Sequence, residues 1–215
     1  LRLNVWRAPL ANELDGWNAY SAGAPRSSGY GSIGHSNTLA SHYYSAGLDN
    51  LGQVVASVSA RTFEGGAAVD VRELILLGGG RGETRQLDQY ISGMSFDGFE
   101  SIWSYIVYGD GRVNIRHTVK PHGTMPPYLP RIGITFVLDG SLSNVQWYGR
   151  GPQANYPDRK SGYRIGIWNT TVEDMYEPYL IPQEYGLRTD NRWVRMTDSD
   201  GTGVEFSVDQ PFNFN

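Results

Sequence analysis

Carboxylates and aromatic side chains gather in the last third of the sequence, and together they are residue types that act on sugars. The acids are Asp158, Glu173, Asp174, Glu177 and Glu184, and the aromatics are Tyr156, Trp168, Tyr176, Tyr179 and Tyr185. A glycosidase needs two carboxyl groups, about 5–5.5 Å apart for retention of configuration or about 6.5–9.5 Å apart for inversion. Spacing along a chain does not fix such a distance. A loop held by Asp–Arg pairs and tyrosine hydrogen bonds is the alternative interpretation.

Two other catalytic motifs are incomplete in this sequence. The glycine-rich run at residues 78–82 lacks the Lys-Ser/Thr pair that follows the glycines of a phosphate-binding loop, and no βαβ pattern surrounds it. A serine-hydrolase elbow needs Gly-x-Ser-x-Gly between a strand and a helix, and no such turn is present. The run at residues 78–82 is therefore predicted to be a mobile glycine turn.

Metal-binding patterns are also incomplete. The histidines, which are His35, His42, His117 and His122, form no His-x-x-x-His pair or facial triad. The run Asp198-Ser199-Asp200-Gly201 resembles the start of a calcium loop, but Asp209 stands where that loop needs a glutamate. Cysteine is absent, which excludes disulfides and thiolate ligands. We therefore expect no metal and no cofactor in this chain.

Charge and hydropathy argue against two classes of partner. The chain has 215 residues and a net charge of −4 without a run of Lys or Arg, so no nucleic-acid partner is expected. No apolar run approaches the roughly 20 residues that span a bilayer, so no membrane partner is expected either. The lack of cysteine fits a reducing compartment, and a cytoplasmic location is predicted, although a secreted protein without disulfides fits as well. The first residues contain neither Met nor a signal-peptide pattern, as in a piece of a longer protein.

The elements that would position these residues are mostly short strands. Strands are predicted at residues 54–60, 102–108, 113–119, 131–138, 145–148, 163–168, 192–196 and 204–208. Gly109-Asp110-Gly111 predicts a hairpin between the second and third of these. One helix is predicted at residues 38–46, capped by Asn37 and stopped at Gly47, after a loop at residues 21–36. This pattern predicts an all-β antiparallel sandwich that forms a single domain over residues 1–215.

Two long segments resemble a known family. Residues 147–159, whose core reads Gly149-Arg150-Gly151-Pro152-Gln153-Ala154-Asn155-Tyr156-Pro157-Asp158-Arg159, are similar to a Gly-x-Gly-Pro-x-Glu-Asn-Tyr-Pro-Asp-Arg segment. That segment belongs to the C-terminal domain, or small chain, of glycoside hydrolase family 2 β-galactosidases, and Ala154 replaces its glutamate. Residues 174–188 resemble the family's next segment, with Tyr185 where asparagine is common.

Weaker matches follow the same order along the chain. Residues 6–13 resemble an Arg-Ala-Pro-x-Asp-Asn-Asp opening in which Ala11 replaces an acid. Residues 43–48 resemble a Trp-x-x-Ala-Gly stretch, and residues 129–133 resemble a strand entry. The resemblance thus covers nearly the whole chain, and it implies a galactose mutarotase-like β-supersandwich, truncated here at both ends.

The resemblance implies a division of labour. In this family, the acid/base and nucleophile glutamates of a retaining β-galactosidase lie in a separate TIM barrel, so no catalytic residue is expected in this chain. The expected partners are that barrel domain or large subunit, the galactoside substrate (lactose, for example), and further copies in a homo-oligomer. The whole enzyme often uses Mg and Na. A tryptophan that this family lends to the substrate pocket follows the segment matched by Phe212-Asn213-Phe214-Asn215, so none of the tryptophans here takes its place.

The matched segments supply the candidate contacts with carbohydrate or with a neighbouring domain. They are Arg150, Asn155, Tyr156, Asp158, Arg159, Glu184 and Tyr185. We expect Gly149, Gly151 and Pro152 to form a turn after a strand, and Asp158 to pair with Arg150 or Arg159.

The two side chains between these arginines have predicted roles as well. Asn155 is expected to brace backbone groups, and the Tyr156 hydroxyl is expected to find a partner. Residues 149–159 and 176–188 would then form a braced loop surface that faces the catalytic barrel, or a loop internal to the domain.

Two alternatives to a β-galactosidase part remain. They are a stand-alone carbohydrate-binding or aldose 1-epimerase-like module, and a purely architectural one. The epimerase signature Asn-His-x-x-Phe-Asn is not found around any histidine.

Overall fold

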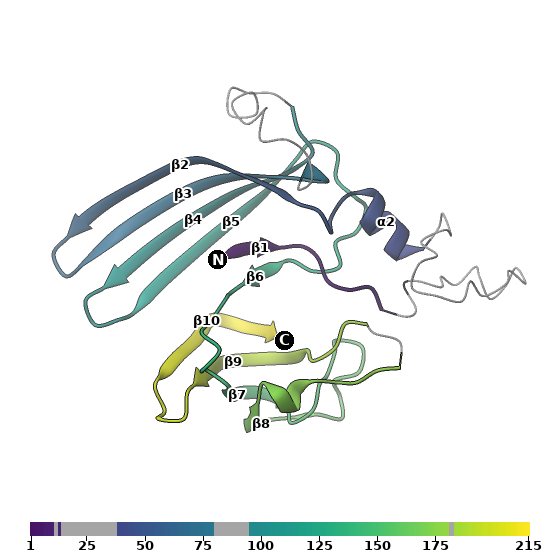
Figure 1. Ribbon diagram of the computed structural model, residues 1–215, viewed down its shortest axis with the longest axis vertical. Helices are drawn as coiled ribbons and strands as arrows, with labels where there is room; N and C mark the ends of the chain where they lie inside the picture. Colours follow the sequence, from purple (N-terminus) through teal and green to yellow (C-terminus); the bar gives the residue numbers. More distant parts are fainter. Residues whose placement is uncertain (11–12, 14–37, 80–94, 181–182) are drawn as a thin grey trace, which may run out of the picture. The chain divides into compact units, whose positions relative to one another are not determined.

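The computed structural model describes residues 1–10, 13, 38–79, 95–180 and 183–215, and the strands that it describes pair antiparallel (Figure 1). The strands are β1 (Arg2–Asn4), β2 (Gly52–Phe63), β3 (Gly66–Leu76), β4 (Gly98–Tyr108), β5 (Val113–His122), β6 (Gly133–Thr135), β7 (Asn144–Gly151), β8 (Arg164–Thr171), β9 (Arg188–Thr197) and β10 (Gly203–Phe214). An α-helix, α2 (Leu39–Ser45), and a 3-10 turn, η3 (Glu173–Met175), accompany them. The all-β antiparallel class is confirmed.

Contacts divide the described chain into two compact units, Arg2–Thr135 and Leu1 with Phe136–Asn215, and each is described by itself. The expectation of one domain over residues 1–215 stays a prediction. Of the predicted loops, residues 21–36 and 80–82 lie outside the described residues.

The first unit is built on a sheet with strand order β2-β3-β4-β5, visible as four long adjacent strands in Figure 1. The predicted hairpin at Gly109-Asp110-Gly111 is confirmed, since β4 and β5 pair from Val107↔Val113 onward. Strand β3 was not predicted, because the polar residues Asp70, Arg72 and Glu73 interrupt its apolar pattern. The predicted strand at residues 131–138 is shorter in the structure, because β6 pairs with only three residues of β1.

Side chains alternate between the two faces of this sheet. One face carries ion pairs between neighbouring strands: Arg61–Asp70 at 3.0 Å, Arg72–Glu100 at 2.6 Å and Lys120–Glu100 at 3.4 Å. Packed against one end of the other face is a core that contains Leu3, Val5, Tyr43, Leu48, Ile75 and Phe99.

The same apolar face encloses a small polar network. Buried Trp103 donates its Nε1 to Glu73 at 3.0 Å, and Gln53 donates to the other oxygen of Glu73 at 2.6 Å. The His117 ring stacks on Trp103 at 3.5 Å, and its Nε2 lies 2.9 Å from Ser101 Oγ. Burial lowers the pKa of His117, and the Glu73 carboxylate opposes this effect. His117 lies in strand β5, and its contacts are all within the fold.

Helix α2 begins and ends by recognisable capping. Its N-cap is Thr38, whose Oγ1 accepts a hydrogen bond from Ser41 N at 3.1 Å, so the predicted cap at Asn37 is one residue too early. The stop at Gly47 is confirmed. Gly47 has φ +69°, its N–H bonds to Tyr44 O, and the Leu48 N–H bonds to Tyr43 O, which is a Schellman ending. No helix in the described part of the chain is long and apolar enough to cross a membrane.

The second unit is a sheet of order β10-β9-β7-β8. The predicted strands at residues 145–148, 163–168, 192–196 and 204–208 correspond to β7, β8, β9 and β10, each of which is longer than predicted. Buried Val145, Trp147 and Val194 form its core with Trp168, Met175, Met196 and the phenylalanines of β10. Strand β7 lies between β9 and β8: β9 pairs with it as far as Tyr148, and β8 continues to Gly151.

Candidate interface site

The candidate segment begins inside strand β7, not in a turn after it. Gly149 and Gly151 pair with Gly166 and Arg164 of β8, so the predicted turn at these glycines is wrong. They are needed for close packing instead: a Cβ on Gly149 would lie 2.0 Å from Asn191 Oδ1, and one on Gly151 would lie 2.6 Å from the Trp168 ring. Pro152 follows the strand through a cis peptide bond.

Arg150 is fixed by a carboxylate that the sequence did not indicate. Its Nε donates to Asp190 Oδ2 at 2.5 Å, and its Nη1 donates to the carbonyls of Tyr163 at 2.7 Å and Lys160 at 3.2 Å. Lys160 Nζ also reaches Asp190, at 3.2 Å. The hydrogen bond from Arg150, and then that from Lys160, lower the pKa of Asp190. The partner of Arg150 is therefore Asp190, and the expected pairing with Asp158 is wrong.

Asn155 braces the loop after β7, as predicted. It is fully buried, and its Nδ2 donates to the carbonyls of Gln153 at 3.1 Å and Arg150 at 3.3 Å. Its Oδ1 accepts from Thr189 N at 3.1 Å and from Thr189 Oγ1 at 2.5 Å, and its own N–H bonds to Leu187 O at 2.7 Å. The amide thus ties the loop to the start of β9, and none of its polar atoms is left for a sugar.

Tyr156 and Arg159 contact each other. The Arg159 guanidinium lies over the Tyr156 ring at 4.9 Å and pairs with no carboxylate among the described residues. The Tyr156 hydroxyl is buried without a hydrogen-bond partner there, so the predicted partner is not found. Burial raises the pKa of Tyr156, while the nearby Leu187 N–H opposes this without reaching hydrogen-bonding geometry.

The remaining candidates lie on the loop and its rim. Glu184 Oε1 accepts from Asn215 Nδ2 at 3.0 Å, and the Tyr185 ring packs edge-on against Tyr176 with centroids 5.5 Å apart. Asp158 is exposed and bonds to no described residue. The structure thus links Arg150 with Asn155 and pairs Tyr156 with Arg159, while Asp158 stays apart.

Sequence reasoning missed Asp190, Thr189 and the surroundings of Arg188. Arg188 is buried over the Trp147 ring, with its guanidinium carbon 5.5 Å from the ring centre, and donates Nη1 to Gly186 O at 2.6 Å. Burial lowers the pKa of Arg188, and Glu177 and Tyr156 oppose this. Arg188 is the last residue of the matched segment at residues 174–188, so the family resemblance could have drawn attention to it. Asp190 lies outside that segment, and no sequence signal indicated it.

A second buried constellation ties the N-terminal segment to helix α2. Glu13 accepts from both terminal nitrogens of Arg7 at 2.7 Å, from Leu10 N at 2.7 Å and from the Tyr43 hydroxyl at 3.1 Å. Burial, and then the Glu13 carboxylate, raise the pKa of Tyr43 to about 12. The charged side chains of the matched opening at residues 6–13 are therefore bonded within the chain, and the segment has a structural role.

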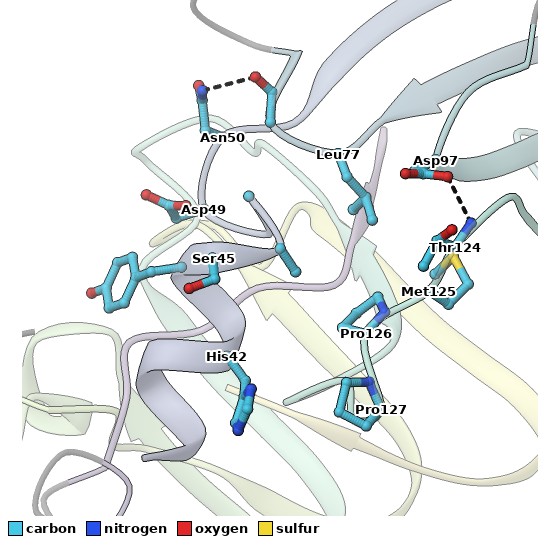
Figure 2. A pocket seen from close by; sticks show the side chains of 14 residues that line it. His42, Ser45, Asp49, Asn50, Leu77, Asp97, Thr124, Met125, Pro126 and Pro127 are labelled. Atoms are coloured by element: carbon cyan, nitrogen blue, oxygen red, sulfur yellow. Dashed lines mark hydrogen bonds between the residues drawn. The ribbon is translucent and has the colours of Figure 1, made fainter. Parts of the chain in front are cut away.

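A cavity of about 690 Å³ lies beside helix α2, lined from the helix by His42, Tyr44 and Ser45 and from loops by Asp49, Asn50, Asp97, Thr124 and Pro126, among others (Figure 2). Its polar groups are partly used within the fold: Asp97 accepts from Thr124 N at 2.6 Å, and Asn50 donates to Gly78 O at 3.3 Å. No group of three His, Asp or Glu side chains suited to a metal was found in the described ranges.

Fold and site together define an antiparallel β-protein in which the polar side chains of the matched segments hold loops in place. A family model described as the β-galactosidase small chain matches residues 1–215, and the chain belongs to that family.

Curated relatives agree with this assignment. The chain is 40% identical to a β-galactosidase of Priestia megaterium over 100 residues, 46% of this chain and 10% of that protein. It is 40% identical over 94 residues to one of Vibrio cholerae, covering 44% and 9%. A Kluyveromyces lactis β-galactosidase is 34% identical over 120 residues, covering 54% and 11%. The matched segments span about a tenth of the length of these relatives.

Proposed function

We propose that the chain is the non-catalytic C-terminal β-sandwich of a retaining β-galactosidase that hydrolyses terminal β-D-galactosides such as lactose. The match of the small-chain family over residues 1–215 carries this proposal. The much greater length of the relatives supports a division in which another domain holds the catalytic glutamates. The chain alone is then inactive, and its fold is the galactose mutarotase-like supersandwich.

Within that enzyme, the loops at residues 149–159 and 176–188 face the catalytic TIM barrel or its cleft. Two features of the described residues support this role. The first loop is held rigidly by Asn155 and Arg150, as a docking surface requires. The second exposes Tyr176, Tyr179 and Leu180, apolar surface that a neighbouring domain would cover.

Other properties follow from the same family membership. The Mg and Na of the whole enzyme would be held outside this chain. The enzyme would be a cytoplasmic homo-oligomer.

A hydrolysis assay tests the proposal. The purified chain should not cleave a chromogenic β-galactoside, whereas the chain together with the barrel-containing remainder of its enzyme should cleave it with retention of configuration. Cleavage by the chain alone would contradict the division of labour. Interconversion of galactose anomers by the chain alone, followed by NMR, would favour an epimerase instead.

A further inference from the structure

Arg188 is a buried cation without an anion. Its side chain is 4% exposed, yet no carboxylate of the described residues forms an ion pair with it. The Trp147 ring and the Gly186 carbonyl are its contacts, and its Nε is buried with no acceptor. A buried charge without a counter-ion and a buried N–H without an acceptor are both unfavourable. Native proteins seldom leave such a group unpaired unless something else completes it.

Neighbouring groups are incomplete in the same way. The Tyr156 hydroxyl and Asn191 Oδ1 are also buried without partners among the described residues. Asn191 donates its Nδ2 to Arg188 O at 2.7 Å, and Asn155, which precedes Tyr156, bonds to Thr189 beside Arg188, so the three orphaned groups lie on segments that are bonded together. The gap in hydrogen bonding is therefore local to this end of the sheet.

The same end of the sheet is strongly basic. Arg164 of β8 pairs with Gly151 at the end of β7, and Arg150 bonds to Asp190, two residues after Arg188 at the start of β9, so these ends meet. The segments at residues 150–164 and 188–192 hold Arg150, Arg159, Lys160, Arg164, Arg188 and Arg192, against the acids Asp158 and Asp190. Asp190 is already shared by Arg150 and Lys160. This excess stands out in a chain whose net charge is −4.

We propose that this basic end of the sheet, with Arg188 as its anchor, binds an aspartate or glutamate on another part of the parent β-galactosidase. The inference rests on the proposed function and names the chemistry of the partner surface. A carboxylate can accept two parallel hydrogen bonds from a guanidinium, which suits the free Nε edge of Arg188. The exposed side chains of Tyr176, Tyr179 and Leu180 offer apolar surface to the same partner, and Arg159 and Arg164, which form no ion pair with a described residue, attract an acidic segment.

Photo-crosslinking in the complete parent protein tests the contact directly. A photo-reactive phenylalanine analogue placed at Tyr179 should crosslink to a segment outside residues 1–215 that contains Asp or Glu, as identified by mass spectrometry. Crosslinks confined to residues 1–215, or to a segment without acids, would overturn the proposal. This map can be read even if the complete protein hydrolyses no galactoside, so the two proposals fail separately.

Variants then assign the role to Arg188. At a fixed urea concentration and low salt, the complete enzyme with Arg188→Met should lose activity at least ten-fold faster than wild type. At high salt, the ratio of the two inactivation rates should be smaller. Replacing the crosslinked acid by its amide should also speed the loss of activity. The double variant should be no worse than Arg188→Met alone, even if Arg188→Met also loosens the sheet. Additive effects of the two changes would contradict the pairing.

Two control variants separate this role from alternatives. Arg195→Met removes a guanidinium that already pairs with Glu205 at 2.7 Å, and should change the rate less than two-fold. Glu177→Gln tests the carboxylate that most strongly influences Arg188 within the chain. It should also have less than a two-fold effect. If Glu177→Gln reproduces the effect of Arg188→Met, the counter-ion is internal and the proposal is wrong.

Discussion

Asp190 Oδ2 lies 2.5 Å from Arg150 Nε although 40 positions separate the two residues. Asp190 is also the one non-glycine residue of the described chain with a left-handed backbone, at φ 54°. Such a conformation is unfavourable for most side chains and persists where the surroundings enforce it. The ion pairs with Arg150 and Lys160 therefore hold the first residues of β9 in place.

Replacing Asp190 by asparagine should lower the free energy of unfolding by about 1–2 kcal/mol at pH 7, since the pair is only partly buried. The hydrogen bond from Arg150 lowers the pKa of Asp190 in the folded state below the ordinary aspartate value of 3.8. Its contribution is therefore present above pH 4 and is lost as the pH falls through the lowered value. Urea unfolding at pH 7 and pH 3 should show a smaller difference between wild type and Asp190→Asn at pH 3. An equal difference at both pH values would contradict the ion-pair role.

Asn155→Ala should cost about 3 kcal/mol, because it leaves the buried Thr189 N–H and hydroxyl without their acceptor and removes the bonds that hold the loop to Gln153 O and Arg150 O. Asn169→Ala is a suitable control, because Asn169 is exposed and bonds to Gln146 on the sheet surface, so its loss should cost less than about 0.5 kcal/mol. Chemical denaturation measures both. Similar losses for the two variants would show that Asn155 is no brace.

Gly149→Ala should destabilise the second unit by about 1–3 kcal/mol through overpacking, because the new methyl group would collide with Asn191. Gly162→Ala, at a site with no atom within 4 Å of the new methyl group, is the matched control and should be neutral or slightly stabilising. Thermal unfolding of both variants is the measurement. A lower midpoint for Gly149→Ala alone indicates crowding against Asn191, whereas equal losses in both variants would indicate a general effect of losing a glycine.

Alkaline pH should weaken the link between Tyr43 and Glu13. The pKa of Tyr43 is about 12 in the folded state against the ordinary tyrosine value of 10.0. The unfolded chain therefore loses this proton first, and stability falls as the pH rises from 10 to 12, by up to about 2 kcal/mol. Tyr43→Phe should be less stable at pH 8 but should show a flatter dependence between pH 10 and pH 12. The free energy of unfolding is measured at each pH by denaturation. If it falls equally for wild type and Tyr43→Phe between pH 10 and pH 12, the assignment is wrong.

Local patterns were readable from the sequence, and long-range pairings were not. The hairpin at Gly109-Asp110-Gly111 and the helix stop at Gly47 depend on neighbouring residues, so their spacing predicted them. Strand β3 was missed because Asp70 and Arg72 face their ion partners on the charged side of the sheet, which hides the apolar alternation.

The candidate site shows the same limit. Asn155 could be predicted as a brace because asparagine suits loops. The pairing of Arg150 with Asp190 depends on β7 lying beside β9, which no local signal reveals. The buried, unpaired state of Arg188 likewise follows from packing on Trp147.

The ion-pair ladder between β2, β3, β4 and β5 fixes the alignment of these long strands. If β3 slipped by one residue, Asp70 and Arg72 would turn toward Trp103 and the apolar side, and Val71 would turn toward the charges. A slip by two residues would keep the faces but would carry Arg72 away from Glu100. The sheet therefore has a single alignment that satisfies both sides, which protects it from mispairing during folding.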